Sequence, residues 1–132
     1  MISHFHFGID DFPRSFAFYI SVLDELGLVL KFRDPEGRWA GWTERGSDRP
    51  MLIIGLPFDH RPANPGNGQM IALNAASREI VDRCHAVAVE GGGTSEGAPG
   101  LRPHYHPYYY GAYFRDIEGN KLCVVCHVPV SA

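Results

Sequence analysis

Hydrophobic and polar residues alternate along residues 2–9, close to the amino end of the chain. His4 and His6 fall on one side of this segment, and three apolar side chains fall on the other. Alternation with a period of two is typical of a β-strand that has one buried and one exposed face. The pattern therefore predicts a strand that presents two histidines on a single face.

A helical pattern follows this strand. Asp11 and Pro13 form a start signal, because an acidic side chain can cap free N–H groups and proline is tolerated in the first turn. Apolar residues then recur at helical spacing as far as Leu26, and Gly27 predicts the end of the helix. Shorter extended segments are expected after it at residues 29–33, 39–43 and 51–55.

The second half of the chain repeats this order. Residues 70–74 are strand-like, and Ser77 is a natural N-cap for a helix that the three glycines at 91–93 end. Residues 116–120 predict a hairpin turn, with Gly119 in the left-handed conformation. The remaining extended segments are expected near residues 94–96, 109–115 and 122–127.

The repetition predicts the fold class. Start and stop signals are equally spaced in the two halves (Asp11 to Gly27, Ser77 to Gly93), which indicates an internal duplication. We expect a single domain over residues 1–132, of the α+β class, with two βαβββ modules forming a half-open curled sheet around a central cleft. Module one covers about residues 1–61, the linker is 62–68, and module two covers about 69–132.

Composition excludes several classes of protein. The net charge is −3 and there is no run of Lys or Arg, so no nucleic-acid partner is expected. No apolar stretch is long enough to span a membrane. The three cysteines and the lack of a signal-peptide pattern favour reduced thiols and a cytoplasmic location.

Both ends of the sequence resemble one family. The opening ISHFHFGIDD and the closing YYGAYFRDIEGNKL resemble the glyoxalase/bleomycin-resistance/extradiol dioxygenase superfamily, also called vicinal oxygen chelate proteins. The resemblance covers nearly the whole chain. It implies a metal in the cleft, with a His on the first strand, a His on the first strand of module two and a Glu on the final strand.

The ligand positions implied by this resemblance are only partly filled. His4 matches the first position, but the other two fall on Met70 and Cys123, and the extra glyoxalase position falls near residues 53–55. A thioether and a single thiol are poor ligands for Mn, Fe, Ni or Zn. The resemblance therefore implies a divalent metal as the cofactor, but the residues at the ligand positions of this sequence disfavour one.

Candidate site residues lie on the expected cleft strands and in the His- and Tyr-rich segment before the last hairpin. His4, His6, His104 and Tyr113 are the candidates for catalytic acid–base groups, and His4 is also the one candidate metal ligand. Half-exposed strand positions and packing against a dimer partner are the structural alternatives for these histidines. The expected substrate contacts are Met70, Ala72, Arg102, His106, Tyr110, Cys123 and Val125.

Two of these residues carry further expectations. Arg102 could hold a carboxylate or a phosphate of a substrate. Cys123 and Cys126 spell C-x-x-C, but residues three apart on a strand point to opposite faces, which argues against a redox or zinc site.

Different function classes remain open from the sequence. The first is a glyoxalase-like protein that binds a small molecule in the cleft, as a lyase, isomerase or dioxygenase with a degenerate metal site. The alternative is a non-catalytic, drug-sequestering protein of the bleomycin-resistance type, and a regulatory role is a third. The His and Arg residues of the groove favour an anionic or neutral ligand. A homodimer is expected because many relatives dimerise and open sheets expose their edges.

Overall fold

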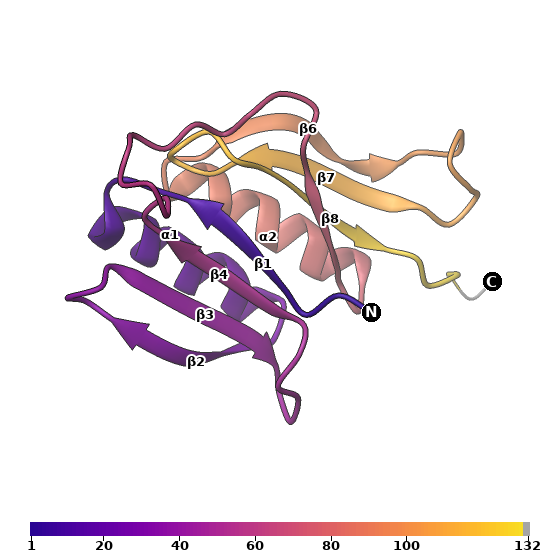
Figure 1. The fold of residues 1–132 in the computed structure, drawn as a ribbon. Coiled ribbons are helices and arrows are strands. Elements are labelled where there is room, and N and C mark those ends of the chain that lie inside the picture. The colour runs from indigo at the N-terminus through magenta and orange to yellow at the C-terminus, as the bar shows by residue number, and fades with distance from the viewer. Residues whose placement is uncertain (131–132) are drawn as a thin grey trace.

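The computed structural model describes residues 1–130, and it confirms the α+β fold class. Each module has a strand, a helix and three further strands, as the pattern predicts (Figure 1). The elements of module one are β1 (His4–Gly8), α1 (Phe12–Glu25), β2 (Leu28–Asp34), β3 (Trp39–Glu44) and β4 (Met51–Gly55). Those of module two are β5 (Ile71–Asn74), α2 (Arg78–Glu90), β6 (Thr94–Leu101), β7 (Tyr110–Arg115) and β8 (Lys121–Cys126).

Each module forms a mixed four-stranded sheet with the same strand order. The first sheet runs β1-β4-β3-β2 and the second runs β5-β8-β7-β6. In each sheet the first and last strands of the module pair in parallel, and the other neighbours are antiparallel. Within the described residues, both sheets are open, with β1, β2, β5 and β6 at their edges.

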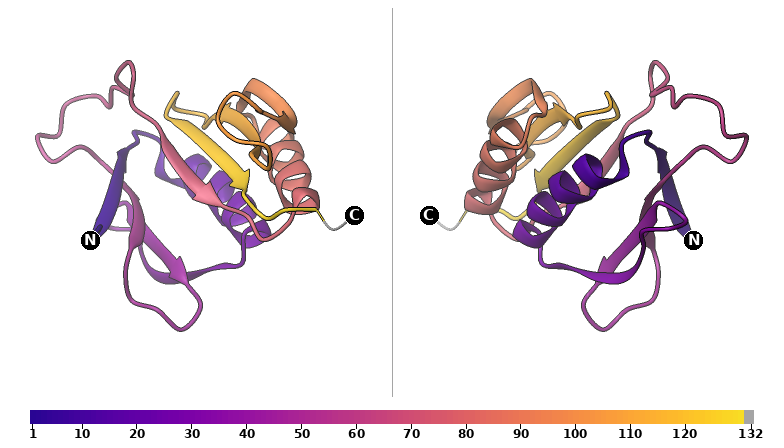
Figure 2. Two further views of the ribbon diagram at one scale, coloured as in Figure 1. Left: turned by 90° about the vertical axis from the view of Figure 1, so that its right-hand side faces the viewer. Right: turned by 90° about the vertical axis from the view of Figure 1, so that its left-hand side faces the viewer.

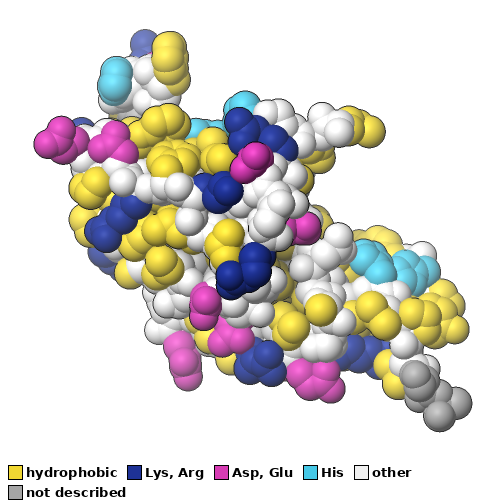
Figure 3. Space-filling view, turned by 90° about the horizontal axis from the view of Figure 1, so that it is seen from below, with side chains coloured by type: hydrophobic (Ala, Val, Ile, Leu, Met, Phe, Trp, Pro, Cys, Tyr) yellow, Lys and Arg dark blue, Asp and Glu magenta, His cyan; other side chains and the backbone are white. Residues whose placement is uncertain are grey.

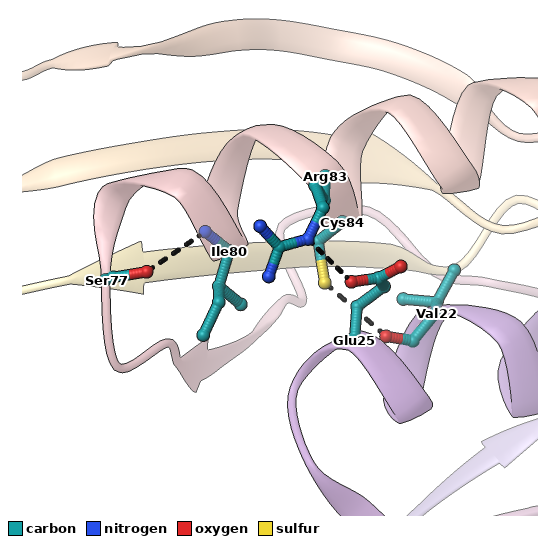
Figure 4. Close-up of polar contacts among 6 residues, drawn as sticks. All are labelled: Val22, Glu25, Ser77, Ile80, Arg83 and Cys84. Carbon is teal, nitrogen blue, oxygen red and sulfur yellow. Dashed lines mark hydrogen bonds and ion pairs between the residues drawn. The ribbon is translucent and has the colours of Figure 1, made fainter.

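The expected capping residues begin both helices. The Asp11 carboxylate accepts a hydrogen bond from the Arg14 N–H at 3.2 Å. The Ser77 hydroxyl accepts one from the Ile80 N–H, also at 3.2 Å (Figure 4). Each bond satisfies one of the N–H groups that the first turn of a helix leaves free.

The two helices lie side by side, behind the first sheet and beneath the second in the view of Figure 1. Arg83 of α2 donates to Glu25 of α1 at 3.0 Å, and the Cys84 thiol approaches the Val22 carbonyl oxygen at 3.4 Å (Figure 4). The rings of Phe18 and Phe114 meet edge to face with centroids 6.3 Å apart. The modules therefore share one hydrophobic core rather than each having its own.

The hairpin turn of residues 116–120 fastens module two to module one. The buried Tyr19 hydroxyl donates to the Asp116 carboxylate at 2.6 Å. Asp116 also accepts from the Asn120 side chain at 2.9 Å, and the same amide donates to the Gly8 carbonyl at 3.1 Å. Gly119 has φ 96°, the left-handed conformation that the sequence predicts for this turn.

The sheet faces that point away from the helices, called the outer faces below, carry the candidate site residues that lie on strands, apart from Tyr110. Because the helices occupy the space between the two sheets (Figure 2), the outer faces do not look at each other within one chain. Among residues 1–130, no helix is long and apolar enough to cross a membrane.

Candidate functional site

The outer faces line two separate hollows that have no residue in common. The first, the His6 hollow, has a volume of about 650 Å³ and is lined by His6, Gly8, Gly37, Trp39 and Gly55 with residues 56–59, 62 and 64. The second, the tyrosine hollow, has a volume of about 540 Å³. It is lined by residues 67–69 with Met70, Tyr105, Tyr109, Tyr113, Arg115 and Lys121.

Strand β1 places His4 and His6 on the outer face of the first sheet. Gly55 makes room for the His6 ring, because a Cβ at this glycine would lie 3.1 Å from His6 Nε2. Partial burial and, second, the neighbouring His4 lower the pKa of His6. His6 is therefore a neutral base at neutral pH, whereas the exposed His4 ring contacts the Ser3 hydroxyl at 2.9 Å.

Three polar side chains meet at the tyrosine hollow: Tyr109 and Tyr113 line it, and Cys123 lies buried beneath them. The Tyr109 hydroxyl lies 2.8 Å from the Tyr113 hydroxyl and 3.4 Å from the Cys123 sulfur. Tyr113 and Cys123 are register partners on β7 and β8, so their side chains point to the same face. Burial raises the pKa of all three groups, and hydrogen bonds to Cys123 and Tyr113 raise that of Tyr109 further. All three are therefore uncharged at neutral pH.

Glycine at position 111 allows Tyr109 to lie against the second sheet. A Cβ at Gly111 would come within 2.9 Å of the Tyr109 ring. With hydrogen there, the ring folds back over β7 and its hydroxyl reaches Tyr113 and Cys123. Cys123 is thereby fully buried although it points to the outer face.

Positive charge surrounds this cluster. Arg102 and Lys121 both approach the Tyr113 ring, with Arg102 Cζ at 5.5 Å and Lys121 Nζ at 5.7 Å from its centroid. Arg115 forms an ion pair with Glu96, which offsets its charge. Over residues 1–130, neither Arg102 nor Lys121 has a carboxylate within ion-pair distance.

A pair of histidines closes the end of the tyrosine segment. His106 Nε2 lies 2.8 Å from His127 Nδ1, and the Tyr108 N–H donates to His106 Nδ1 at 3.1 Å. Because His106 Nδ1 accepts, its Nε2–H is the donor toward His127. Figure 3 shows histidine and hydrophobic side chains gathered at this end of the molecule, beside the carboxyl terminus.

The structure brings together part of the expected site. Met70 and Tyr113 line the tyrosine hollow, and Arg102 contacts the Tyr113 ring from the β6 side. Cys123 does not line the hollow but lies buried behind the Tyr109 hydroxyl. His104 packs on the Tyr105 ring at 4.2 Å between centroids. Val125 is buried on the same outer face.

Other expected residues lie elsewhere. His4 and His6 belong to β1 of the first sheet and line no part of the tyrosine hollow in the part of the chain that the structure describes. Tyr110 points to the helix side, where its hydroxyl donates to Asp82 at 2.7 Å, so it is not positioned for the expected substrate contact. Ala72 lines a third hollow of about 200 Å³ between the modules, together with Phe5 and Trp42.

The donor groups do not fit the metal centre that the resemblance implies. Met70 offers a thioether, and the Cys123 thiol is buried and engaged by Tyr109. Cys123 lies on the second sheet and Met70 directly precedes its strand β5, whereas His4 lies on the first sheet. Within the part of the chain that the structure describes, no three His, Cys, Asp or Glu side chains gather closely enough to hold a metal ion.

Sequence reasoning missed Lys121 and Trp39 as parts of the two hollows. Lys121 follows the turn directly and reads as a solvated hairpin residue. Its alternation with Cys123 along β8 was the available signal, since residues two apart on a strand share a face.

Comparison with known proteins identifies the family. The model of the Glyoxalase/Bleomycin resistance protein/Dioxygenase superfamily matches residues 1–124. A glyoxalase/bleomycin resistance protein from Albidiferax ferrireducens T118 is 31% identical, covering 98% of this chain and 99% of its own, with a TM-score of 0.82. A glyoxalase-related enzyme from Fulvimarina pelagi is 22% identical over 100% of this chain and 93% of its own, with a TM-score of 0.73. None of the curated proteins matches the sequence significantly.

The sequence match and the fold agree with each other over almost the whole chain. The chain belongs to the Glyoxalase/Bleomycin resistance protein/Dioxygenase superfamily.

Proposed function

We propose that this protein binds a small molecule in the tyrosine hollow and that it does so without the metal centre of its superfamily. One observation carries the proposal: Tyr109 and Tyr113, which line a hollow walled by aromatic rings, form a hydrogen-bonded, uncharged cluster with the buried Cys123 behind them. Concave sites with mostly apolar walls and a few placed polar groups are the usual form of small-molecule sites. The residues at the family's ligand positions support binding without a metal, because Met70 and the buried Cys123 are poor metal ligands.

We also propose that two copies of the chain complete the cleft. The His6 hollow and the tyrosine hollow are each one-sided within a chain, and open sheet edges favour pairing. A two-fold dimer can bring the His6 hollow of one protomer against the tyrosine hollow of its partner. A cytoplasmic location suits the three free cysteine thiols.

An acid–base enzyme is the second candidate, and His6 is the observation that favours it. A lowered pKa leaves His6 able to accept a proton at neutral pH. In the proposed dimer, Tyr113 of the facing hollow would supply a proton to the same ligand. The drug-sequestering alternative needs the same hollow and no turnover.

The test of binding uses benzamide, a neutral aromatic probe. We expect benzamide to shift the backbone amide NMR signals of residues 109–113 and 121–123, with and without a chelator. Tyr109→Phe, which removes one hydroxyl of the cluster, should weaken binding several-fold because the polar cluster loses a partner. Tyr108→Phe is the matched control, since Tyr108 lies in the same loop but does not line the hollow.

Two results would contradict the proposal. The first is an absence of shifts in these segments at saturating benzamide. The second is binding that appears only after Mn, Fe, Ni or Zn is added, which would restore the metal-dependent reading of the family.

A further inference from the structure

The charges around the tyrosine hollow narrow the class of ligand that it can hold. The ionisable groups that line the hollow are Lys121, Arg115 and the tyrosines, and Arg102 and the Cys123 thiol contact these tyrosines from outside it. Arg115 is neutralised by Glu96, and the phenols Tyr109 and Tyr113 and the thiol keep their protons. Two positive charges without a carboxylate partner in residues 1–130 are left, on Lys121 and Arg102.

Lys121 is held in a position to meet a ligand. Its ammonium group lies over the Tyr113 ring at 5.7 Å from the centroid, and its side chain is half-buried in the wall of the hollow. Attraction between a cation and an aromatic face keeps the flexible lysine side chain near the ring. Arg102 approaches the same ring, but its guanidinium donates to the Ala98 carbonyl oxygen at 2.7 Å and it does not line the hollow.

The walls favour a flat apolar body on this ligand. Tyr105 and Met70 are 60% and 41% exposed at the rim, so covering them would remove apolar surface from water. The Tyr105 and Tyr109 rings lie 4.8 Å apart at an angle of 51°, which gives the hollow an aromatic corner. Such rings pack well against another aromatic ring.

From these contacts we infer that the tyrosine hollow takes an aromatic carboxylate, with Lys121 binding the carboxylate and the tyrosine rings packing on the aromatic ring. Lys121 is then the residue that determines specificity for an anion. The inference rests on the proposed small-molecule site and adds the chemical class of the ligand to it. Charge-assisted hydrogen bonds to a carboxylate are stronger than neutral ones, so the charge is expected to dominate selectivity.

The experiment compares benzoate with its neutral isostere benzamide and with acetate, by NMR titration of the full chain. We expect benzoate to bind about tenfold tighter than benzamide, and acetate to bind more weakly than both. Lys121→Gln should reduce benzoate affinity about tenfold and reduce benzamide affinity by a much smaller factor, while Lys121→Arg should retain most of the preference for benzoate.

The chain offers a matched control, because Lys31 is its only other lysine. Lys31 pairs with Asp48 at 3.1 Å and lies outside the hollow, so Lys31→Gln should leave both affinities unchanged. Thermal unfolding of each variant checks that folding is intact.

The outcomes separate this inference from the proposed function. Equal affinities for benzoate and benzamide would overturn the anion assignment and leave the binding site standing. Acetate binding as tightly as benzoate would overturn the aromatic part. Failure of both aromatic probes to shift residues 109–113 would overturn the proposed function as well.

Discussion

Two ionisable side chains in the core of this protein, Tyr19 and Cys84, retain their protons. Tyr19 is fully buried, and burial, followed by the nearby Asp116 carboxylate, raises the pKa of its hydroxyl well above the ordinary value. Cys84 lies between the two helices, where burial raises the pKa of its thiol to about 12. Both groups hold their protons more tightly in the folded chain than in the unfolded one.

This proton binding predicts how stability depends on pH. The folded pKa of Cys84 lies above the unfolded value of about 8.5, so its stabilising contribution is complete below about pH 8.5 and is lost as the pH rises toward about 12. We expect the free energy of unfolding to fall above about pH 9, by at most about 1.4 kcal/mol per pH unit for each such group. Urea unfolding under reducing conditions measures the effect. Cys84→Ala should show a shallower decline, and an identical decline in variant and parent would contradict this account.

At the scale of the structural elements, the hairpin turn at residues 116–120 also holds the two modules together, and its local sequence does not predict this role. Residues 116–120 predict a turn, and the structure confirms it, with Gly119 at positive φ. The same turn also provides Asp116 to α1 and Asn120 to the end of β1. It therefore acts as the connection between the two modules.

The Tyr19 hydroxyl tests this connection. Tyr19→Phe removes the 2.6 Å bond to Asp116 and leaves a buried carboxylate with one partner fewer. We expect the free energy of unfolding to fall by about 1–3 kcal/mol. Tyr108→Phe is the control, because Tyr108 is 45% exposed and its ring lies in the loop before β7. Equal stabilities of the two variants in urea unfolding would count against a structural role for the turn.

Strand β6 shows where local sequence is a weak guide. The pattern predicts a strand only at residues 94–96, since Gly97, Pro99 and Gly100 are poor strand formers. In the structure the strand continues to Leu101, with register shifts at its glycines. Backbone pairing with the neighbouring strand β7 keeps β6 extended, although its own residues have low strand propensity.

The whole molecule presents the His6 hollow and the tyrosine hollow on different sheets. The proposed dimer predicts a species of twice 14.7 kDa by light scattering or sedimentation. Trp39→Glu, in the His6 hollow, should shift the protein toward monomer because a charge replaces an apolar contact. Leu30→Glu is a matched control, since Leu30 is 39% exposed against 42% for Trp39 and lies outside that hollow. A monomer at every concentration, or the same effect from both substitutions, would contradict the dimer.

Local pattern determined the elements and the class of this protein. Period-two and helical spacing, together with the caps Asp11 and Ser77, predict the helices and most strands, because these signals depend on residues close together in the chain. The resemblance of the two chain ends predicts the superfamily, which the family match confirms.

Only the tertiary structure decided which candidate residues lie next to one another. Packing both helices between the sheets turns His6 away from Tyr113, and a missing side chain at Gly111 lets Tyr109 cover Cys123. Lys121 gains its place beside Tyr113 from strand register. Each of these contacts joins residues that helix packing or strand pairing brings together. The spacing of residues along the chain does not determine how the two modules are oriented, and so it could not predict these contacts.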